Sequence, residues 1–417
     1  MSPAAPEGIA WPEDGRLESA LAETDSSRPL SLYVHVPFCS VRCGYCDFNT
    51  YTKGFGPGAS PGDYAPSILA EARLATRILA DAGWAPRPAS TVFLGGGTPT
   101  VLASSELARI LDHLRSTFGI AAEAEVTVEA NPDSIDAHGL EELQAAGVTR
   151  VSFGMQSAVP SVLATLDRTH DPERVPIVVE AAKDAGLDVS LDLIYGAPGE
   201  SLEDWRCSVE VAIGLSPDHI SAYALVIEEG TKMGRMLARG VIPEPDPDEE
   251  AAKYELADHL LAQAGYRWYE ISNFARAQRG EEDTVASELR YASKHNLAYW
   301  RDCDWWGLGP GAHSHVGRYR WWNLKHPRAY ASRVSAGMSP AAAGEILDAD
   351  SRSLEKVMLA VRTAEGLAIA DVPNPQVIDD LSAEGLIEKK AVLDSRIVLT
   401  LRGRLLADAV TRRLMGF

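Results

Sequence analysis

Short apolar runs alternate along the chain with longer windows in which apolar residues recur every three or four positions. The runs contain many β-branched residues and predict strands, whereas the windows have the period of amphipathic helices. The predicted strands cover residues 31–36, 91–94, 125–129, 150–154, 188–194 and 219–225. The predicted helices cover residues 63–82, 104–118, 134–146, 173–185 and 202–215. In the first helix, we expect Ile68, Ala72, Ala75 and Leu79 to form the buried face.

This alternation of strand and helix predicts a parallel sheet covered by helices, which is an α/β fold. The repeat of roughly thirty residues is that of a β/α barrel unit. Six units are too few for a closed eight-stranded barrel, so we expect an open (β/α)6 partial TIM barrel. Ligands of such barrels bind at the carboxyl ends of the strands.

Changes in composition divide the chain into further parts. Residues 1–29 are acidic and rich in Ala, Pro and Ser, and they predict a mobile leader before a barrel over 30–240. Residues 241–347 are predicted as a linker, which begins with three closely spaced prolines, followed by an extension. Within the extension, a helix is expected over 249–264, and the polar stretch 275–293 is expected to be a flexible insertion.

The last part, residues 348–417, is predicted as a small α+β domain. Helices around 354–362 and 375–384 precede two short apolar segments, 386–388 and 396–400, which we expect to pair as a hairpin. Helices followed by a hairpin resemble a winged helix. The acidic residues of the second helix argue against DNA binding by this domain.

The charge and composition of the 417 residues exclude several classes of partner. The 39 Lys and Arg against 59 Asp and Glu give a net charge of −20, which disfavours nucleic acid and anionic lipid. We find no apolar segment long enough to span a membrane, and the acidic first thirty residues are unlike a signal peptide. The sequence therefore predicts a cytoplasmic protein without a membrane span.

Three cysteines lie close together, on the loop that follows the first predicted strand. The spacing Cys39-x3-Cys43-x2-Cys46 allows three thiolates to bind one inorganic centre. In a cubane with four irons, three protein thiolates leave one iron open to an added chelator. The alternatives are a zinc site completed by His35 and a set of free thiols.

The pattern YxHxPFCx3CxYC over residues 33–46 resembles the signature of radical S-adenosylmethionine (SAM) enzymes. It is most similar to the branch that contains oxygen-independent coproporphyrinogen III oxidase and the HemW heme chaperones. The resemblance implies a radical SAM barrel with a [4Fe–4S] cluster on Cys39, Cys43 and Cys46. It also implies that SAM binds the open iron through its methionine end.

Further motifs at the ends of predicted strands match the same family. The Gly-rich turn 95–100 follows the second strand, SFGMQS ends the fourth and DLIYGAPG ends the fifth. The residues that the resemblance assigns to the SAM site are Tyr33, Tyr45, Gly96, Gly97, Thr98, Glu129, Gln156, Arg168, Asp192 and Ala224.

Two features favour the chaperone branch over the oxidase branch. Similar oxidases have a fourth cysteine two residues after the last cluster ligand, where this chain has Phe48. In addition, the HNxxYW motif of residues 295–300 matches one that is implicated in heme binding in HemW proteins. The resemblance therefore implies a heme site formed by His295, Asn296, Tyr299 and Trp300.

The expected function is binding of heme and its transfer to an acceptor hemoprotein, with coproporphyrinogen III oxidase of porphyrin biosynthesis as the alternative. His295 is the expected axial ligand, and His313 and His315 form a competing pair. The resemblance suggests a flavodoxin- or ferredoxin-type electron donor and a homodimer. Whether the chain turns over radical chemistry as an enzyme stays open.

Overall fold

The computed structural model describes residues 8–18, 27–281 and 284–417. Its central feature is a sheet of thirteen described strands in the order β1-β13-β12-β11-β10-β2-β3-β4-β5-β6-β7-β9-β8. These strands are β1 Ile9–Ala10, β2 Leu30–Val36, β3 Ala89–Gly96, β4 Ile120–Ala130, β5 Arg150–Gln156, β6 Asp188–Tyr195, β7 His219–Ala224, β8 Tyr266–Glu270, β9 Asn273–Arg276, β10 Asp304–Leu308, β11 His313–Val316, β12 Tyr319–Asn323 and β13 Ala341–Ile346.

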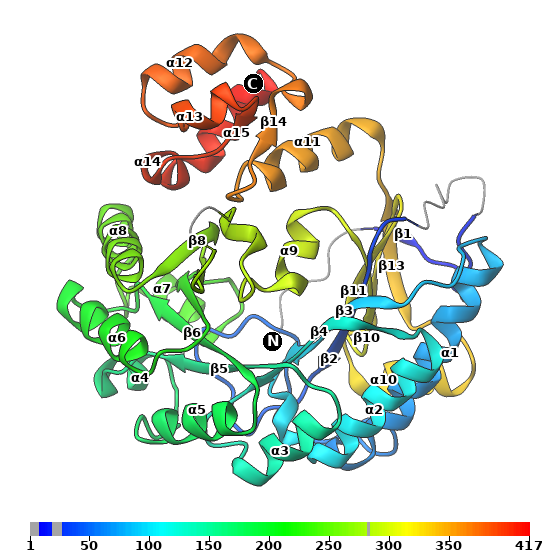
Figure 1. Cartoon of the computed structure of the whole chain (residues 1–417). Helices are drawn as coiled ribbons and strands as arrows, with labels where there is room; N and C mark the ends of the chain where they lie inside the picture. The colour runs from blue at the N-terminus through cyan, green and yellow to red at the C-terminus, as the bar shows by residue number, and fades with distance from the viewer. Residues whose placement is uncertain (1–7, 19–26, 282–283) are drawn as a thin grey trace.

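The middle of the sheet is the predicted open barrel. Strands β2 to β7 are parallel neighbours in chain order, and β10 adds a further parallel strand beside β2. Helices cover the outer side of this arc (Figure 1). They are α1 Ala65–Asp81, α2 Ser104–Thr117, α3 Ala137–Ala145, α5 Arg174–Asp184 and α6 Leu202–Gly214. The short helices α4 Pro160–Thr165 and α7 Lys232–Ala238 belong instead to a small separate apolar cluster beside the cysteine loop, where Met233 N donates to Gly44 O at 2.9 Å. The six strands and five long helices predicted from the sequence are confirmed, whereas the short helices α4 and α7 were not predicted.

The strands separate two environments because successive side chains point to opposite faces. In β2, Leu32, Val34 and Val36 are fully buried in the apolar core between the sheet and the helices. The expected face of α1, with Ile68 and Ala72 at 0% exposure, packs into that core. The alternate positions face the lumen of the barrel, where many side chains are polar.

The predicted mobile leader is wrong for residues 8–18. Strand β1 pairs antiparallel with β13, and the Trp11 ring stacks on Trp321 with 5.6 Å between centroids. Leu17 is buried in the main core. A two-residue strand carries too weak a pattern to be recognised, because the residues that stabilise it lie more than three hundred positions away. Residues 1–7 and 19–26 of the expected leader lie outside the described residues.

The extension predicted over 241–347 belongs to the barrel rather than to a separate part. The linker ends at helix α8 (Pro247–Gln263), which packs against α6. Strands β8 and β9 continue the sheet beyond β7, and β10 to β13 continue it beyond β2. Along the chain, helix α9 (Lys294–Trp300) connects β9 to β10, and helix α10 (Pro327–Ser335) connects β12 to β13.

The polar stretch 275–293 is not a loose insertion where the structure describes it. Ala286, Leu289 and Ala292 are buried together in a small apolar cluster. Arg290 also pairs with Asp188 of the barrel at 2.8 Å. Residues 282 and 283 of this stretch lie outside the described residues.

Residues 348–417 form a mainly helical unit with its own apolar core. Its elements are α11 Ala349–Ala360, β14 Leu367–Ala368, α12 Ile378–Ala383, α13 Lys389–Leu393, β15 Arg396–Ile397, α14 Leu401–Leu405 and α15 Ala407–Met415. The expected pairing of 386–388 with 396–400 is present, since Ile387 bridges Leu399, but α13 interrupts the hairpin. Figure 1 shows this unit beside β8 and α9. Among the described residues, we find no helix of the length and apolarity needed to cross a bilayer.

Candidate functional site

A cavity of about 670 Å³ occupies the lumen of the barrel. Its mouth lies at the carboxyl ends of the strands, where the cysteine loop follows β2. Its floor lies near the amino ends, where α9 contacts β3. The three predicted cluster cysteines and all the SAM-site residues predicted from the sequence line this cavity, together with His295, Asn296 and Tyr299. Trp300 is half-buried and is not part of the lining.

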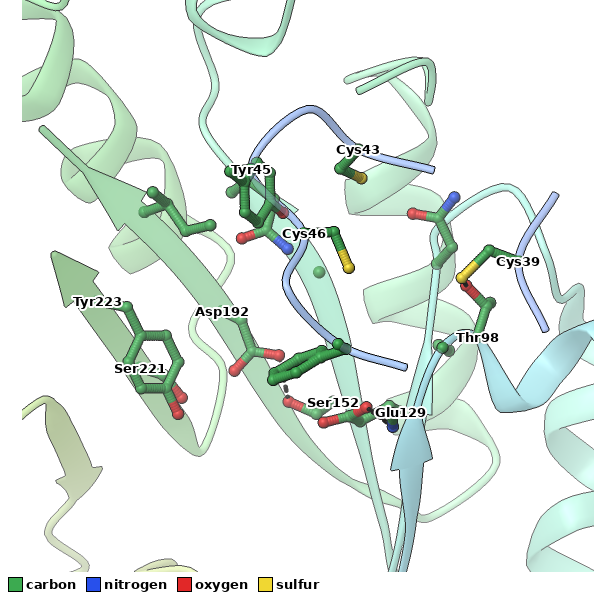
Figure 2. Close-up of a pocket in the computed structure, with 18 of the residues that line it drawn as sticks. Cys39, Cys43, Tyr45, Cys46, Thr98, Glu129, Ser152, Asp192, Ser221 and Tyr223 are labelled. Carbon is green, nitrogen blue, oxygen red and sulfur yellow. Dashed lines mark hydrogen bonds between the residues drawn. The ribbon is translucent and has the colours of Figure 1, made fainter. Parts of the chain in front are cut away.

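The cysteine loop is held in place by backbone hydrogen bonds. Cys39 N donates to Tyr51 O at 3.0 Å, and Tyr51 N donates to Pro37 O at 2.7 Å, so the loop closes on itself. Asn49 Nδ2 donates to Pro310 O at 2.9 Å, which fixes the loop to the segment after β10. Figure 2 shows the three cysteines around one end of the cavity.

A polar side chain lies near each cysteine sulfur. Thr98 Oγ1 lies 3.8 Å from Cys39 Sγ, and Thr50 Oγ1 lies 3.7 Å from Cys46 Sγ. Arg168 Nη1 lies 3.6 Å from Cys43 Sγ. Burial raises the pKa of Cys39 to about 11, and it also raises the pKa of Cys46. Without a metal these two thiols are therefore neutral, and iron would have to displace their protons.

The zinc alternative does not fit the geometry. Among the described residues, no group of three or more His, Cys, Asp or Glu side chains converges on a site for a single metal ion. Both ring nitrogens of His35 are in use, since Nδ1 lies 3.0 Å from Tyr33 Oη and Nε2 lies 3.0 Å from Asn49 O. His35 is therefore engaged in other contacts and is not available as the fourth ligand of a zinc site.

The Gly-rich turn is required by the packing of the protein itself. Gly96 has a φ of +106°, and a Cβ atom there would lie 2.3 Å from the His35 ring. A Cβ atom on Gly97 would lie 2.6 Å from Phe38 O. Gly97 N and Thr98 N donate to Val36 O and Phe38 O, each at 2.8 Å. The glycines therefore let the turn pack directly against the cysteine loop.

Two carboxylates, one from β4 and one from β6 on the other side of β5, face the cavity. Glu129 Oε2 accepts from Gly96 N at 3.0 Å, and Asp192 Oδ2 accepts from Ser152 Oγ at 2.9 Å. Burial, followed by the charge of Asp192, raises the pKa of Glu129 to about 7. Burial also raises the pKa of Asp192, although its hydrogen bonds to Ser221 and Ser152 oppose this shift. The site can therefore accept a cationic group, which would favour the charged carboxylates.

The end of β5 brings Gln156 and Arg168 to the same wall. Gln156 has a φ of +62°, which is costly for a residue with a side chain and is often found at functional positions. Arg168 Nη2 donates to Gly154 O at 2.8 Å and to Asn131 Oδ1. Arg168 thus connects β5 with the loop after β4 and with Cys43.

The remaining predicted positions lie around the same space. Tyr33 stacks on Phe93 in the lumen, and Tyr45 packs in a small apolar cluster near the mouth. Ala224 ends β7 and lies opposite Tyr195 of β6. Phe48, at the position of the missing fourth cysteine, lines the mouth and is 58% exposed.

The predicted heme ligand His295 is buried at the floor of the cavity. Its Nδ1 lies 2.7 Å from Thr91 Oγ1 and its Nε2 lies 2.9 Å from Tyr299 Oη. Its ring stacks on Phe93 with 5.0 Å between centroids. Burial lowers the pKa of His295 to about 4, so the imidazole is neutral at physiological pH.

The other members of the predicted heme motif have different roles. Asn296 Nδ2 donates to Glu270 Oε1 at 2.8 Å, which fixes α9 to β8.

The competing ligand pair, His313 and His315, lies on β11 and is not part of the cavity lining. His313 is exposed and stacks on Trp322, whereas His315 is buried and its Nε2 lies 3.0 Å from Gly317 O.

The sequence interpretation missed the polar residues of the lower cavity. They are Thr127, Arg150, Ser152, Ser190, His219, Ser221, Tyr223, Asn273 and Ser293. Most occupy alternate positions of β4 to β7, as the pairs Arg150/Ser152 and His219/Ser221 illustrate. Polar residues at every second position of an otherwise buried strand were the available signal, because these positions share one face.

Comparison with known proteins agrees with this geometry. The model of the radical SAM superfamily matches residues 33–211. The heme chaperone HemW of Mycobacterium tuberculosis is 46% identical over 392 residues, covering 93% of this chain and 95% of that protein. The chain belongs to the HemW family of radical SAM proteins. The Bacillus subtilis HemW is 32% identical over 398 residues, covering 93% of this chain and 99% of that protein.

A solved structure supports the fold of this HemW family member. The coproporphyrinogen III oxidase HemN from Escherichia coli, described as a radical SAM enzyme, aligns with a TM-score of 0.76. The alignment covers 98% of this chain and 96% of that chain at 23% sequence identity. At this identity the likeness establishes a common fold, and membership of the superfamily implies a [4Fe–4S] cluster and SAM.

Proposed function

We propose that the protein is a heme chaperone, which binds heme and transfers it to an acceptor hemoprotein. The observation that carries the proposal is the 46% identity to a protein named heme chaperone HemW over nearly the whole length of both chains. Phe48 at the position of the fourth oxidase cysteine supports the same choice. The five free cysteines suit a reducing compartment, and we propose the cytoplasm.

In this proposal Cys39, Cys43 and Cys46 hold a [4Fe–4S] cluster, and the residues around the upper cavity hold SAM. The bound groups would supply reductive cleavage of the SAM sulfonium bond. Glu129 and Asp192 provide negative charge for a cationic ligand. Arg168 connects Cys43 with β5 and with the loop after β4. Thr98 and Thr50 offer hydroxyl protons to the sulfurs, which favours thiolate ligation.

Heme is the cargo, and His295 is the proposed axial ligand of its iron. A neutral imidazole whose second nitrogen is already hydrogen-bonded is a typical protein ligand for iron. Phe93 and Tyr299 supply aromatic contacts for a flat ligand. Because the proposed heme and SAM residues line one cavity, occupation of the upper part can influence loading at the floor.

The proposal extends to the partners of transfer. A flavodoxin- or ferredoxin-type donor would reduce the cluster, and two copies of the chain would associate during transfer. Both partners enter the proposal through the family.

A paired measurement tests the function. Cluster-loaded protein is titrated with hemin while the Soret band is followed, and the same preparation is incubated anaerobically with coproporphyrinogen III, SAM and a reductant. We expect saturable hemin binding, its passage to an apo-hemoprotein, and no protoporphyrinogen. Formation of protoporphyrinogen would instead assign the chain to the oxidases.

His295→Ala tests the proposed ligand in the same titration. We expect hemin affinity to fall at least tenfold and the Soret maximum to shift, because the iron loses its axial nitrogen. His313→Ala is the matched control, since His313 lies on β11 outside the cavity. An unchanged spectrum and affinity for His295→Ala would remove His295 from the proposed site.

A further inference from the structure

The hydrogen bonds around His295 define which of its ring nitrogens carries the proton. Thr91 Oγ1 donates its single hydroxyl proton to Ser31 Oγ at 2.9 Å. Thr91 therefore has only lone pairs left for His295 Nδ1, 2.7 Å away. His295 must donate from Nδ1, and its Nε2 atom carries the free lone pair.

The free lone pair of Nε2 is occupied by a second residue of α9. Tyr299 Oη lies 2.9 Å from Nε2, and with the tautomer fixed by Thr91 the phenol must be the donor. Residues 295 and 299 are one helical turn apart, so the two side chains meet on the same face of α9. The two rings meet edge to face with 5.0 Å between centroids.

The backbone around His295 is fixed by a separate set of contacts. Glu125 Oε1 accepts from His295 N at 3.0 Å and from Ser293 Oγ at 3.3 Å. Asn296 fixes the other side of the helix through Glu270. Loss of the Tyr299 hydroxyl would therefore leave α9 anchored and would change only the environment of Nε2.

We propose that Tyr299 is a removable cap on the metal-binding nitrogen of His295, and that Thr91 is the positioning residue that keeps this nitrogen deprotonated. The inference rests on the proposed function, because it concerns heme iron as the group that replaces the cap. In the heme-free protein the phenol satisfies a buried acceptor. Heme iron can bind only after the Tyr299 hydroxyl has left Nε2, so the cap lowers heme affinity and slows loading.

The tautomer can be measured without heme. In ¹⁵N spectra of histidine-labelled, cluster-loaded protein, His295 is assigned by its absence in His295→Gln. We expect a protonated Nδ1 and an unprotonated Nε2 in the natural protein, and the same pattern in Thr91→Ser, which keeps the hydroxyl. Thr91→Val should lose this pattern. A protonated Nε2 in the natural protein would overturn the proposal whatever the result with heme.

The cap is tested with hemin as the probe. Tyr299→Phe leaves Nε2 without a partner in the heme-free state, and the loss of such a buried hydrogen bond corresponds to about tenfold tighter hemin binding. The association rate should rise and the rate of transfer to apomyoglobin should fall. Tyr266→Phe is the control, because it also removes a buried hydroxyl, which donates to Pro217 O at 2.7 Å, but lies outside this cavity.

The outcomes separate this inference from the function it rests on. If His295→Ala abolishes hemin binding but Tyr299→Phe binds hemin no more tightly than the natural protein, Tyr299 is not a cap and the chaperone proposal stands. If His295→Ala has no effect, both the ligand assignment and the cap are wrong. Circular dichroism of Tyr299→Phe and Thr91→Ser confirms that any change in affinity arises in folded protein.

Discussion

Replacing Arg150 by Met is expected to destabilise the floor of the barrel. Arg150 is only 2% exposed, and its guanidinium contacts Glu125 Oε2 at 3.1 Å, Ser190 Oγ at 3.1 Å and Tyr291 O at 3.0 Å. Glu125 is also buried. The substitution therefore leaves a buried carboxylate without its cation.

The size of the effect follows from these contacts. Removing one member of a buried ion pair costs about 3–5 kcal/mol of unfolding free energy. Glu125 would keep two donors, His295 N and Ser293 Oγ, so we expect a loss near the lower bound, about 3 kcal/mol. Exposed pairs contribute much less, and Arg206→Met, which breaks a surface pair with Glu203, should cost under about 1 kcal/mol.

Urea unfolding followed by tryptophan fluorescence and circular dichroism measures these differences. The double variant Arg150→Met/Glu125→Gln should recover part of the loss, because the amide carries no unpaired charge and still accepts from His295 N. The reasoning would be refuted if Arg150→Met cost no more unfolding free energy than Arg206→Met. It would also be refuted if the double variant lost more unfolding free energy than the two single variants lose when their losses are added.

Two further predictions concern buried carboxylates with a pKa of about 7. Glu129 is largely protonated at pH 6 and largely charged at pH 8, so the affinity of the cluster-loaded protein for SAM should rise about tenfold between these pH values. In the Glu129→Gln variant the affinity for SAM should not change with pH in this range. Equilibrium dialysis at several pH values measures both affinities. Burial also raises the pKa of Glu71 to about 7. The protonated side chain therefore stabilises the folded protein fully below pH 4.5, and this contribution of about 3 kcal/mol to the free energy of unfolding is lost as the pH rises through 7. The Glu71→Gln variant cannot lose this contribution, so its stability relative to the natural protein should increase from pH 5 to pH 8 in urea titrations. A difference in stability between the two proteins that does not change with pH would contradict the assignment.

The barrel could be predicted from the sequence because its pattern is local. The face of α1 formed by Ile68 and Ala72 repeats every three or four residues, and each strand is a short run rich in β-branched and apolar residues. The cysteine loop and the Gly-rich turn were also predictable, since each follows its strand directly. Their contact through Gly96 and His35 could not be foreseen, because it depends on how two loops pack.

The lower cavity depends on contacts between distant segments. Thr91, Glu125 and Arg150 come from three strands and have meaning only once α9 lies across them. The sequence interpretation identified His295 as the expected axial ligand, and the structure adds the partners that surround it. The strands of the extension were missed because they are short and pair with partners on either side of the barrel.

The pairing of β1 with β13 has a consequence for shortened versions of the protein. With β1 in place, the outer edge of β13 is covered over Ala343 and Gly344, and Trp11 shields Trp321. A version beginning at Leu30 would expose the unpaired peptide groups of β13 and the ring of Trp321 to solvent. Such edges recruit strands from other molecules, so we expect truncation to produce aggregates rather than a compact minimal barrel.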